Sequence, residues 1–435
     1  MATEAPAPTP APELSPAVVL QWRSAGEPLI ELLTRAAAVG PVCVLRLGGT
    51  TAALLTDPQG VQHVLARHPD RYVKRSHRLR ALLGDGVVCA EGEPWKRQRR
   101  FLQRHFTGQG IRRFHRAIED AARGAAGRWE AYARTGEAFD LVEEMRWYSL
   151  DVIWRALTGR GIDPSTQREL QTLQSIFAAL PVLPGQGEQP SLAPHVARID
   201  AVVAHTIEQA RQAATHSMPT QDPGLLHTLL DAAAEHPEYT ERLIRDEIVT
   251  LIVAGHETTA TTLTWLFLLL DRNPRERALA LAAGPRGSAA RTASLQALLS
   301  ECLRLYPAAW LLPRHAIEDD TVAGHRIEAG TTVLSSPYFT HRDPGLWPEP
   351  EAFRPRRFLT GEDRPTRPGA YYPFGLGPRA CLGAQFALRE ATALLEHLLP
   401  AFVPTLHGAP PGAAFAVTIN PVGPVTTTLA PDPAA

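Results

Sequence analysis

The stretch Phe374-Gly-Leu-Gly-Pro-Arg-Ala-Cys381-Leu-Gly383 is the most informative part of this 435-residue sequence. It places a cysteine directly before the run Leu382–Leu399, whose apolar residues recur with helical periodicity. A thiolate serves as an iron ligand only if its pKa is lowered and its charge is hydrogen-bonded. The unpaired N–H groups and the dipole of a helix N-terminus would meet both needs. The stretch therefore points to Cys381 as a metal-ligand candidate.

The residues around this cysteine suit a bound cofactor, and two other interpretations compete with that one. Gly375, Gly377 and Gly383 would let the loop approach a flat cofactor without Cβ clashes, and Arg379 would reach an anionic group on it. A buried core cysteine is a common alternative. A dinucleotide fingerprint would need a strong strand before the glycines, and Pro373 is a poor residue for a strand interior.

Composition sets the broad class. The chain has 44% hydrophobic and 20% charged residues, which suits a globular protein with a large core. Its formal net charge of -1 argues against a surface-wide attraction to nucleic acid. The four cysteines lack zinc-type or disulfide spacing, which favours a reducing compartment; they are Cys43, Cys89, Cys302 and Cys381.

Nothing in the sequence predicts a membrane anchor. Residues 1–18 are rich in Pro and Ala, and we expect a disordered tail there, followed by one domain over residues 19–435. The apolar run Ile248–Leu270 contains His256, Glu257 and several threonines, which are expensive in the hydrocarbon region. We therefore expect a buried helix at this run. Since no signal peptide or anchor is visible, we also expect a cytoplasmic protein, and we expect it to be a monomer.

Periodicity predicts a mainly helical fold with small β-sheets. Helices are expected at Trp95–Phe106, Ile111–Thr135, Leu141–Leu157, Gln167–Leu180, Val196–Ala213, Glu241–Leu270, Ala293–Leu305 and Leu382–Leu399. Strands are expected at Val42–Leu47, Thr51–Thr56, Thr332–Leu334, Ala414–Thr418 and Val425–Leu429.

The cysteine stretch resembles the haem loop of the cytochrome P-450 family, Phe-x-x-Gly-x-Arg-x-Cys-x-Gly. Phe374, Gly377, Arg379, Cys381 and Gly383 match its five fixed positions. The resemblance implies haem b (iron protoporphyrin IX) with Cys381 as the thiolate ligand. It also implies that Phe374 shields the sulfur, that Arg379 pairs with a haem propionate, and that Gly383 belongs to the cofactor-binding loop. The implied fold is a triangular single-domain prism, with the haem between a long central helix and the cysteine-loop helix.

A second segment carrying the resemblance is Ala254-Gly255-His256-Glu257-Thr258-Thr259, inside the long predicted helix. Small residues leave space beside a helix, and an acid next to a hydroxyl is a plausible proton route. The start of an HExxH zinc motif is present, but Ala260 stands where the second histidine is needed. By the resemblance, Glu257 and Thr258 carry protons during oxygen activation.

Further matches concern support and cofactor binding. Glu301 and Arg304 resemble the family's Glu-x-x-Arg pair, which would lock to Arg357 and support the cysteine loop. This chain has Arg356 where the family often has Glu. The resemblance also assigns haem propionate contacts, namely Trp95, Arg99 and Arg314.

The implied reaction inserts one oxygen atom from O2 into an unactivated bond of an organic substrate. No flavin or iron–sulfur module is visible, so electrons from NAD(P)H would come through a separate ferredoxin or flavodoxin with its reductase. A basic cluster offers a docking face for such an acidic partner: Lys96, Arg97, Arg99, Arg100, Arg104, Arg112 and Arg113. The alternatives are a peroxide-driven enzyme, which the acid–threonine pair disfavours, and a haem-binding module without turnover.

The predicted substrate walls are short of charge, which favours an apolar substrate such as a terpenoid, a carotenoid or a fatty acyl chain. The candidates for these walls are Leu82, Leu83, Val87, Val88, Phe177, Leu180, Ala254, Ala308, Trp310 and Leu311.

Overall fold

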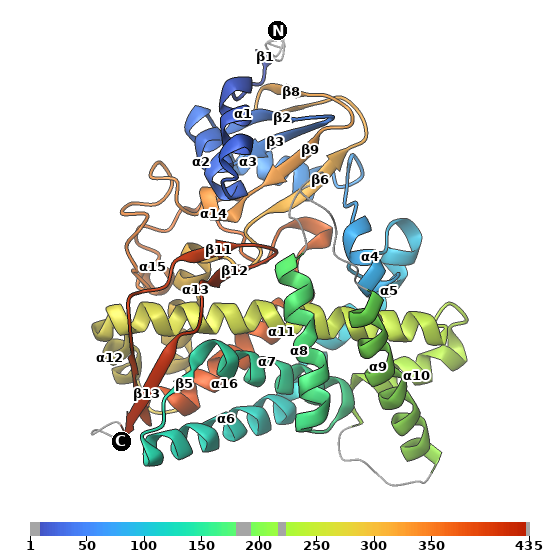
Figure 1. The fold of residues 1–435 in the computed structure, drawn as a ribbon, viewed down its shortest axis with the longest axis vertical. Coiled ribbons are helices and arrows are strands. Elements are labelled where there is room, and N and C mark those ends of the chain that lie inside the picture. Colours follow the sequence, from blue (N-terminus) through green and yellow to red (C-terminus); the bar gives the residue numbers. More distant parts are fainter. Residues whose placement is uncertain (1–8, 180–192, 216–222, 432–435) are drawn as a thin grey trace. The chain divides into compact units, whose positions relative to one another are not determined.

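The computed structural model describes residues 9–179, 193–215 and 223–431 (Figure 1). Its chain forms two compact units, each assembled from three stretches of sequence. Unit 1 comprises Met1–Arg75, Leu303–Ala352 and Thr360–Cys381, and unit 2 comprises Ser76–Cys302, Phe353–Leu359 and Leu382–Ala435. Because the stretches alternate, no single point in the sequence separates the units.

Unit 1 is built on a five-stranded mixed sheet of order β2-β3-β9-β6-β4. A smaller sheet of order β1-β8-β7 belongs to the same unit. The strands of the two sheets are β1 (Thr9–Pro10), β2 (Val42–Leu47), β3 (Thr50–Leu55), β4 (Tyr72–Val73), β6 (Leu312–Ala316), β7 (Asp320–Val322), β8 (His325–Ile327) and β9 (Thr332–Ser335). Its helices are α1 (Pro16–Ala25), α2 (Leu29–Val39), α3 (Pro58–Gln62), a π-helical turn at His63–Arg67 and α14 (Pro337–Thr340).

The predicted disordered tail is wrong for residues 9–18, while residues 1–8 lie outside the described part of the chain. The Thr9 N–H donates to Gly324 O at 3.1 Å, and the Leu14 N–H donates to Val44 O of β2 at 2.9 Å. Leu14 is 5% exposed. Pairing with strand edges and burial of Leu14 therefore outweigh the Pro/Ala composition.

The cysteine loop rests on the core of unit 1. Leu376 packs against a cluster of buried side chains that includes Leu65 from the π-helical turn and Tyr372. Gly377, with φ +70°, begins a short 3-10 turn, Gly377–Arg379. A Cβ at Gly377 would lie 2.2 Å from Leu65 O. Glycine is thus required here by positive φ and by the closeness of another backbone.

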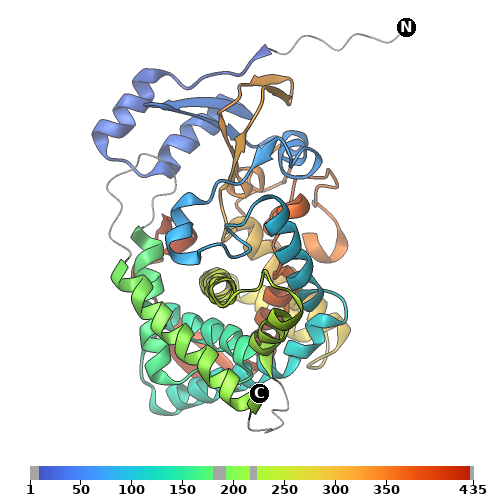
Figure 2. The ribbon, with the colours of Figure 1, turned by 90° about the vertical axis from the view of Figure 1, so that its right-hand side faces the viewer.

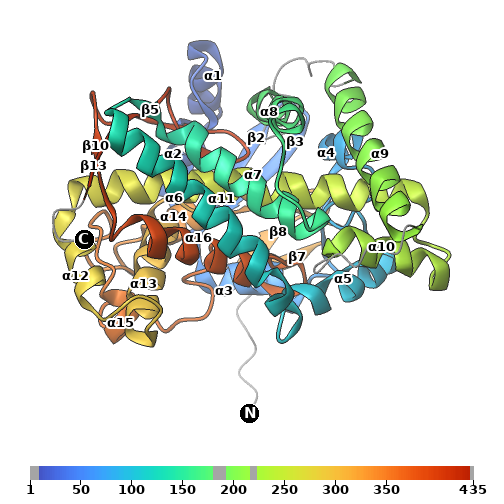
Figure 3. The same cartoon turned by 90° about the horizontal axis from the view of Figure 1, so that it is seen from below.

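Unit 2 is mainly helical and surrounds α11 (Glu241–Arg272), a helix of 32 residues. Figure 2 looks along α11, and Figure 3 shows α7 crossing it. The other helices are α4 (His77–Leu83), α5 (Gly92–Phe106), a 3-10 turn at Gly110–Phe114, α6 (His115–Thr135), α7 (Leu141–Thr158), α8 (Pro164–Ala179), α9 (Ala193–Thr215), α10 (Gly224–Glu235), α12 (Pro274–Ala282), α15 (Arg357–Thr360) and α16 (Ala384–Leu398), with α13 (Ala289–Leu305) running from this unit into unit 1.

Two small sheets complete unit 2. Their strand orders are β10-β13-β5 and β11-β12. The strands are β5 (Phe139–Asp140), β10 (Phe402–Leu406), β11 (Ala413–Phe415), β12 (Ile419–Pro421) and β13 (Thr426–Pro431). The hydroxyl of Thr261 and the indole N–H of Trp265 both donate to Ile419 O, at 2.6 and 2.8 Å, which fixes α11 against β12.

The predicted mainly helical class is confirmed, and the run Ile248–Leu270 is a buried helix as expected. No helix within the described ranges is long and apolar enough to cross a membrane. Of the strand expected over Ala414–Thr418, only Ala414 and Phe415 lie in a strand, β11. Residues 416–418 form the turn that leads to β12, with which β11 pairs as a hairpin.

We predict that Gly377→Ala lowers the free energy of unfolding by about 1–3 kcal/mol, because it adds left-handed strain and a clash with the backbone at Leu65. Chemical denaturation of the variant and the parent measures the loss. Gly49→Ala is the matched control, since nothing lies within 4 Å of a Cβ there and φ is not positive. Equal stability of both variants would contradict the packing argument.

Candidate active site

Backbone hydrogen bonds shape the cysteine loop. The Cys381 N–H donates to Phe374 O at 2.8 Å, the Ala380 N–H to Gly377 O at 3.0 Å, and the Gly375 N–H to Tyr372 O at 2.9 Å. These bonds close the loop across its two ends. Cys381 is exposed, whereas the other three cysteines are buried, and burial raises the pKa of Cys43 to about 11. Of the four thiols, Cys381 is therefore the accessible one.

The predicted helix after the cysteine begins slightly later than expected. Its first residue is Ala384, with Gly383 as the N-cap, so two residues separate Cys381 from the helix. Nothing lies within 4 Å of a Cβ built on Gly383. Of the three loop glycines, Gly377 is the one whose absent side chain is explained by packing within the protein.

Two arginines of unit 1 lie close enough to repel each other. Arg314, on β6, is 8% exposed, and burial together with the nearby Arg379 lowers the pKa of Arg314 to about 10. The Arg314 guanidinium donates to Pro313 O at 2.8 Å. Within the described residues no carboxylate pairs with Arg314. Because an unpaired buried charge is costly, an anion from a bound molecule would stabilise this guanidinium.

The long helix α11 has a single open stretch. Between Asp246 and Leu270 every residue is buried except Ala254, Gly255 and Thr258. Positions 254 and 258 are one turn apart and share a face of the helix. The Thr258 hydroxyl donates to Ala254 O at 2.8 Å. A small surface of Cβ and hydroxyl groups is thus presented at the middle of the helix.

A buried acid stands next to this stretch. Glu257 is 4% exposed, and its Oε1 accepts a hydrogen bond from Arg146 Nη2 of α7 at 3.2 Å. Arg146 Nη1 also donates to Glu143 Oε1 at 2.8 Å, and the Glu143 side chain is 46% exposed. A chain of polar groups therefore connects Glu257 with the surface of unit 2.

Arg146 could not have been found by sequence reasoning, because it is 111 residues from Glu257 in the sequence. Glu390 of α16 escapes prediction for the same reason. Its Oε1 accepts the Thr259 hydroxyl at 2.5 Å, and burial raises the pKa of this carboxyl well above its ordinary value. Glu390 is thus held as a neutral acid that joins α16 to α11.

The predicted pair of Glu301 and Arg357 is present and fully buried. Arg357 Nε lies 3.1 Å from Glu301 Oε1, and the Arg354 N–H donates to the same oxygen at 2.9 Å. The side chains of Arg357 and Glu301 are 1% and 0% exposed. Removal of either partner would leave a buried charge without its counterion, which is costly.

Arg304 supports a different set of backbone groups, all in unit 1. It donates to His341 O, Pro350 O and Ala352 O at 2.9, 2.6 and 3.0 Å. His341 Nε2 in turn accepts the Tyr372 N–H at 2.9 Å. Burial lowers the pKa of His341 well below its ordinary value, so the ring stays neutral and can accept. Sequence reasoning assigned no role to His341, yet it connects Arg304 to the start of the cysteine loop.

The remaining predicted site residues are divided between the units. Trp95 and Arg99 lie on α5 of unit 2, both half-buried, and Arg99 Nε donates to Gln103 Oε1 at 3.3 Å. Leu83, in unit 2, and Trp310, in unit 1, are each 1% exposed.

Other predicted wall residues differ in exposure. Ala254 is exposed, Leu311 half-buried and Ala308 buried. The side chain of Phe177 and all of Leu180 lie outside the described part of the structure. Val87 is 8% exposed, and its N–H donates to Glu247 Oε2 at 3.0 Å.

A mainly helical fold with a glycine-shaped cysteine loop and an acid–threonine helix is the arrangement of haem-thiolate proteins. The family model described as "Cytochrome P450" matches residues 6–279 and 289–413. The chain belongs to the cytochrome P450 family, and it is a monooxygenase of that family.

Relatives and solved structures agree. The chain is 31% identical over 395 residues to "Cyclooctatin synthase" of Streptomyces melanosporofaciens, covering 84% of this chain and 83% of that protein. It is 32% identical over 394 residues to "Cyclooctat-9-en-7-ol 5-monooxygenase" of the same organism, with the same coverage. The crystal structure of CYP175A1 from Thermus thermophilus matches with TM-score 0.74 and 32% identity, covering 96% of this chain and 100% of that one.

The residues present fit a haem. Cys381 is the accessible thiol, Arg314 is a buried cation that no described carboxylate neutralises, and the Ala254–Thr258 stretch is the open face of α11. The described residues thus include groups of the chemistry that iron, propionates and oxygen require. The family implies haem and the use of O2.

We predict that Cys381→Ala abolishes loading with haem bound through sulfur. The carbon monoxide complex of the reduced variant would then lack the Soret band typical of a thiolate ligand, which absorption spectroscopy measures. Cys89→Ala changes a buried cysteine and should keep that band. An unchanged band in the Cys381 variant would remove this residue as the ligand.

A second prediction concerns Glu247, whose pKa burial raises from 4.5 to about 8. As pH rises from about 4.5 to 8 the unfolded state loses this proton before the folded state, so the free energy of unfolding falls. Linkage puts the full loss at roughly 4–5 kcal/mol. Glu247→Gln should make stability less dependent on pH in this window, as denaturation at a series of pH values would show.

The control for this measurement is Glu235→Gln, which changes an exposed acid on α10. It should leave the pH dependence of the parent intact. If Glu247→Gln and the parent lose the same stability between these pH values, Glu247 does not retain its proton in the folded protein.

Proposed function

We propose that the protein is an O2-dependent monooxygenase that hydroxylates or epoxidises an apolar, terpenoid-like substrate, with electrons from NAD(P)H delivered by a separate redox protein. A thiolate-ligated haem supplies the oxygen activation. The observation that carries the proposal is the open stretch at Ala254–Thr258 with the buried, ion-paired Glu257 beside it.

The proposed role of Glu257 and Thr258 is to hold and pass protons. The Thr258 hydroxyl donates to Ala254 O, and one rotation about its C–O bond would turn the same proton toward a ligand on the open stretch. Glu257 Oε2 has no hydrogen-bond partner within the described residues, whereas Oε1 is held by Arg146. Release of this ion pair would let the carboxylate accept a proton from the Glu143 side and return it inward.

The proposed roles of the other site residues follow their chemistry. Cys381 would ligate the iron and Phe374 would shield the sulfur. The propionates would be bound by Arg314, Arg379, Trp95 and Arg99. Arg is suited to this task because its planar guanidinium pairs with a carboxylate through two hydrogen bonds.

Structural support is assigned to a second set. Glu301 with Arg357 and Arg304 with its carbonyl partners stabilise the segments next to the loop. Gly383 lies in the loop itself.

The substrate class is inferred from two observations. Predicted wall residues such as Val87, Ala254 and Leu311 carry no charge. Two relatives from one Streptomyces species bear names of cyclooctatin chemistry, one of them acting on cyclooctat-9-en-7-ol. A cyclic terpenoid is therefore favoured over a carotenoid or a fatty acyl chain.

Exposure and existing ion pairs favour some residues of the proposed docking face for the redox partner over others. Arg113 donates to Gly224 O and to Thr228 Oγ1, and thus helps fix α10 within unit 2. Lys96 is paired with Glu93 at 2.6 Å. Arg100 and Arg112 are exposed and have no ion pair with other described residues, so they are the best candidates to meet an acidic partner.

We predict that Thr258→Ala uncouples reductant consumption from product formation. Loss of a positioned proton donor would lower the yield of product per NAD(P)H by roughly ten- to a hundredfold, at or below the range typical of general acid–base contributions. Product yield and peroxide release, measured with a surrogate ferredoxin and reductase, check this. Thr262→Ala is the control, because that hydroxyl donates to Thr258 O one turn further along α11.

Coupling in Thr258→Ala equal to that of the parent would exclude this hydroxyl from the proton route. The peroxide-driven alternative is tested in the same assay. Turnover with hydrogen peroxide that exceeds turnover with O2 and reductant would overturn the O2-dependent assignment.

A further inference from the structure

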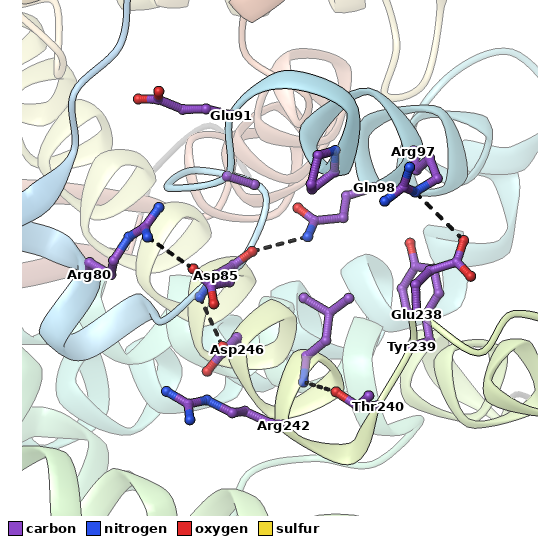
Figure 4. Close-up of a pocket in the computed structure, with 13 residues that line it drawn as sticks. Arg80, Asp85, Glu91, Arg97, Gln98, Glu238, Tyr239, Thr240, Arg242 and Asp246 are labelled. Carbon is purple, nitrogen blue, oxygen red and sulfur yellow. Dashed lines mark hydrogen bonds and ion pairs between the residues drawn. The ribbon is translucent and has the colours of Figure 1, made fainter.

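A polar pocket lies in unit 2, away from the open stretch of α11. Its walls come from α4 and the loop after it, the first turns of α5, and the first turns of α11 with the segment leading into them (Figure 4). The lining residues are Arg80, Asp85, Ala90, Glu91, Pro94, Arg97, Gln98, Glu238, Tyr239, Thr240, Arg242, Leu243 and Asp246. Along α11, Asp246 is eight residues from Ala254, or about 12 Å at the rise of an α-helix. The pocket is thus separate from the region proposed for oxygen chemistry.

Hydrogen bonds hold the walls of this pocket in place. The Asp85 N–H donates to Asp246 Oδ2 at 2.9 Å, and Gln98 Nε2 donates to Asp85 O at 3.0 Å. Thr240 Oγ1 accepts the Leu243 N–H at 3.2 Å and caps α11. The three wall segments are therefore connected to one another, and the pocket is preformed.

Two buried polar atoms in the walls have no partner within the described residues. They are Gln98 Oε1 and the hydroxyl of Tyr239, whose residues are 4% and 3% exposed. Both residues line the pocket, and Figure 4 shows the Gln98 amide directed toward Asp85 and Tyr239 lying beside Glu238. The bond from Gln98 Nε2 to Asp85 O fixes the amide so that Oε1 is an acceptor. Burial raises the pKa of Tyr239, so its hydroxyl keeps its proton and can donate.

The charges around the pocket largely neutralise one another. Three ion pairs account for most of them: Arg80 with Asp85 at 3.3 Å, Arg97 with Glu238 at 3.9 Å, and Arg245 with Asp246 at 2.9 Å. Glu91 and Arg242, of opposite sign, remain at the edge. A strongly charged ligand would thus meet no net counter-charge, and a neutral one is favoured.

We propose that this pocket binds a neutral small molecule that carries a hydroxyl group on an apolar body. A hydroxyl group can both accept a hydrogen bond, as Tyr239 offers, and donate one, as Gln98 Oε1 requires, so it suits the two kinds of buried group in these walls. Ala90, Pro94 and Leu243 supply apolar surface for the rest of the molecule. Hydroxylation produces alcohols, so the pocket would bind the class of product that this enzyme makes. In this respect the inference rests on the proposed function.

The test uses the haem-loaded enzyme and two probes of similar size, cyclohexanol and methylcyclohexane, of which only the first has a hydroxyl. Saturation-transfer NMR titrations measure their affinity, while haem absorbance reports binding next to the iron separately. Tyr239→Phe removes the hydroxyl but keeps the ring, which lies 4.8 Å from Phe101. Gln98→Leu removes the acceptor. Tyr132→Phe is the control, because Tyr132 stacks on Phe139 outside the pocket.

We expect Tyr239→Phe and Gln98→Leu each to weaken cyclohexanol binding about tenfold, the usual effect of leaving one buried hydrogen-bonding group unpaired. Tyr132→Phe should bind like the parent, and methylcyclohexane should bind the parent no better than cyclohexanol binds the variants. Unchanged cyclohexanol affinity in Tyr239→Phe overturns the proposal. Displacement of cyclohexanol by inorganic phosphate also overturns it, because the site would then be one for anions. Neither outcome depends on turnover, so failure of the monooxygenase assignment would be recognised separately.

Discussion

The cysteine loop depends on a backbone constraint, the left-handed turn at Gly377 against the carbonyl of Leu65. Beside this turn Leu376 packs against the core of unit 1, and the Cys381 N–H donates to Phe374 O across the loop. The thiol is then left on the exposed side of the loop. An anionic sulfur needs this kind of rigid presentation, because a flexible loop would let it be protonated or buried.

Buried charges support the same region through backbone carbonyl groups. Arg304 donates hydrogen bonds to three carbonyl oxygens of residues 341–352. His341, one of these residues, accepts a hydrogen bond from the N–H of Tyr372. Such networks are costly when only partly satisfied, and they specify one arrangement when complete. In unit 2 the neutral acid Glu390 and the ion pair of Glu257 with Arg146 restrain the acid–threonine stretch in a comparable way.

Periodicity is a good guide to the long helices and a poor one to contacts between distant segments. The helix predicted over Leu141–Leu157 is α7, Leu141–Thr158, because its apolar residues repeat over several turns. The first residues of α1 lie within the stretch predicted to be a disordered tail. The prediction fails because the preceding Pro/Ala-rich stretch is held by hydrogen bonds to β2, which is distant in sequence. β6 escapes prediction because Pro313 and Arg314 interrupt any apolar alternation. The candidate site residues come from local motifs, whereas Arg146, His341 and Glu390 act through partners far away in sequence. Gly377 is predicted to contact a cofactor, yet the structure explains it by packing against a neighbouring backbone.

The central claim is that the sulfur of Cys381 is the protein's ligand to haem iron. X-ray absorption spectroscopy of the haem-loaded protein tests this most directly, because it identifies the elements bonded to iron. The account predicts one sulfur neighbour in addition to the porphyrin nitrogens. A first coordination sphere made of nitrogen and oxygen alone would contradict it.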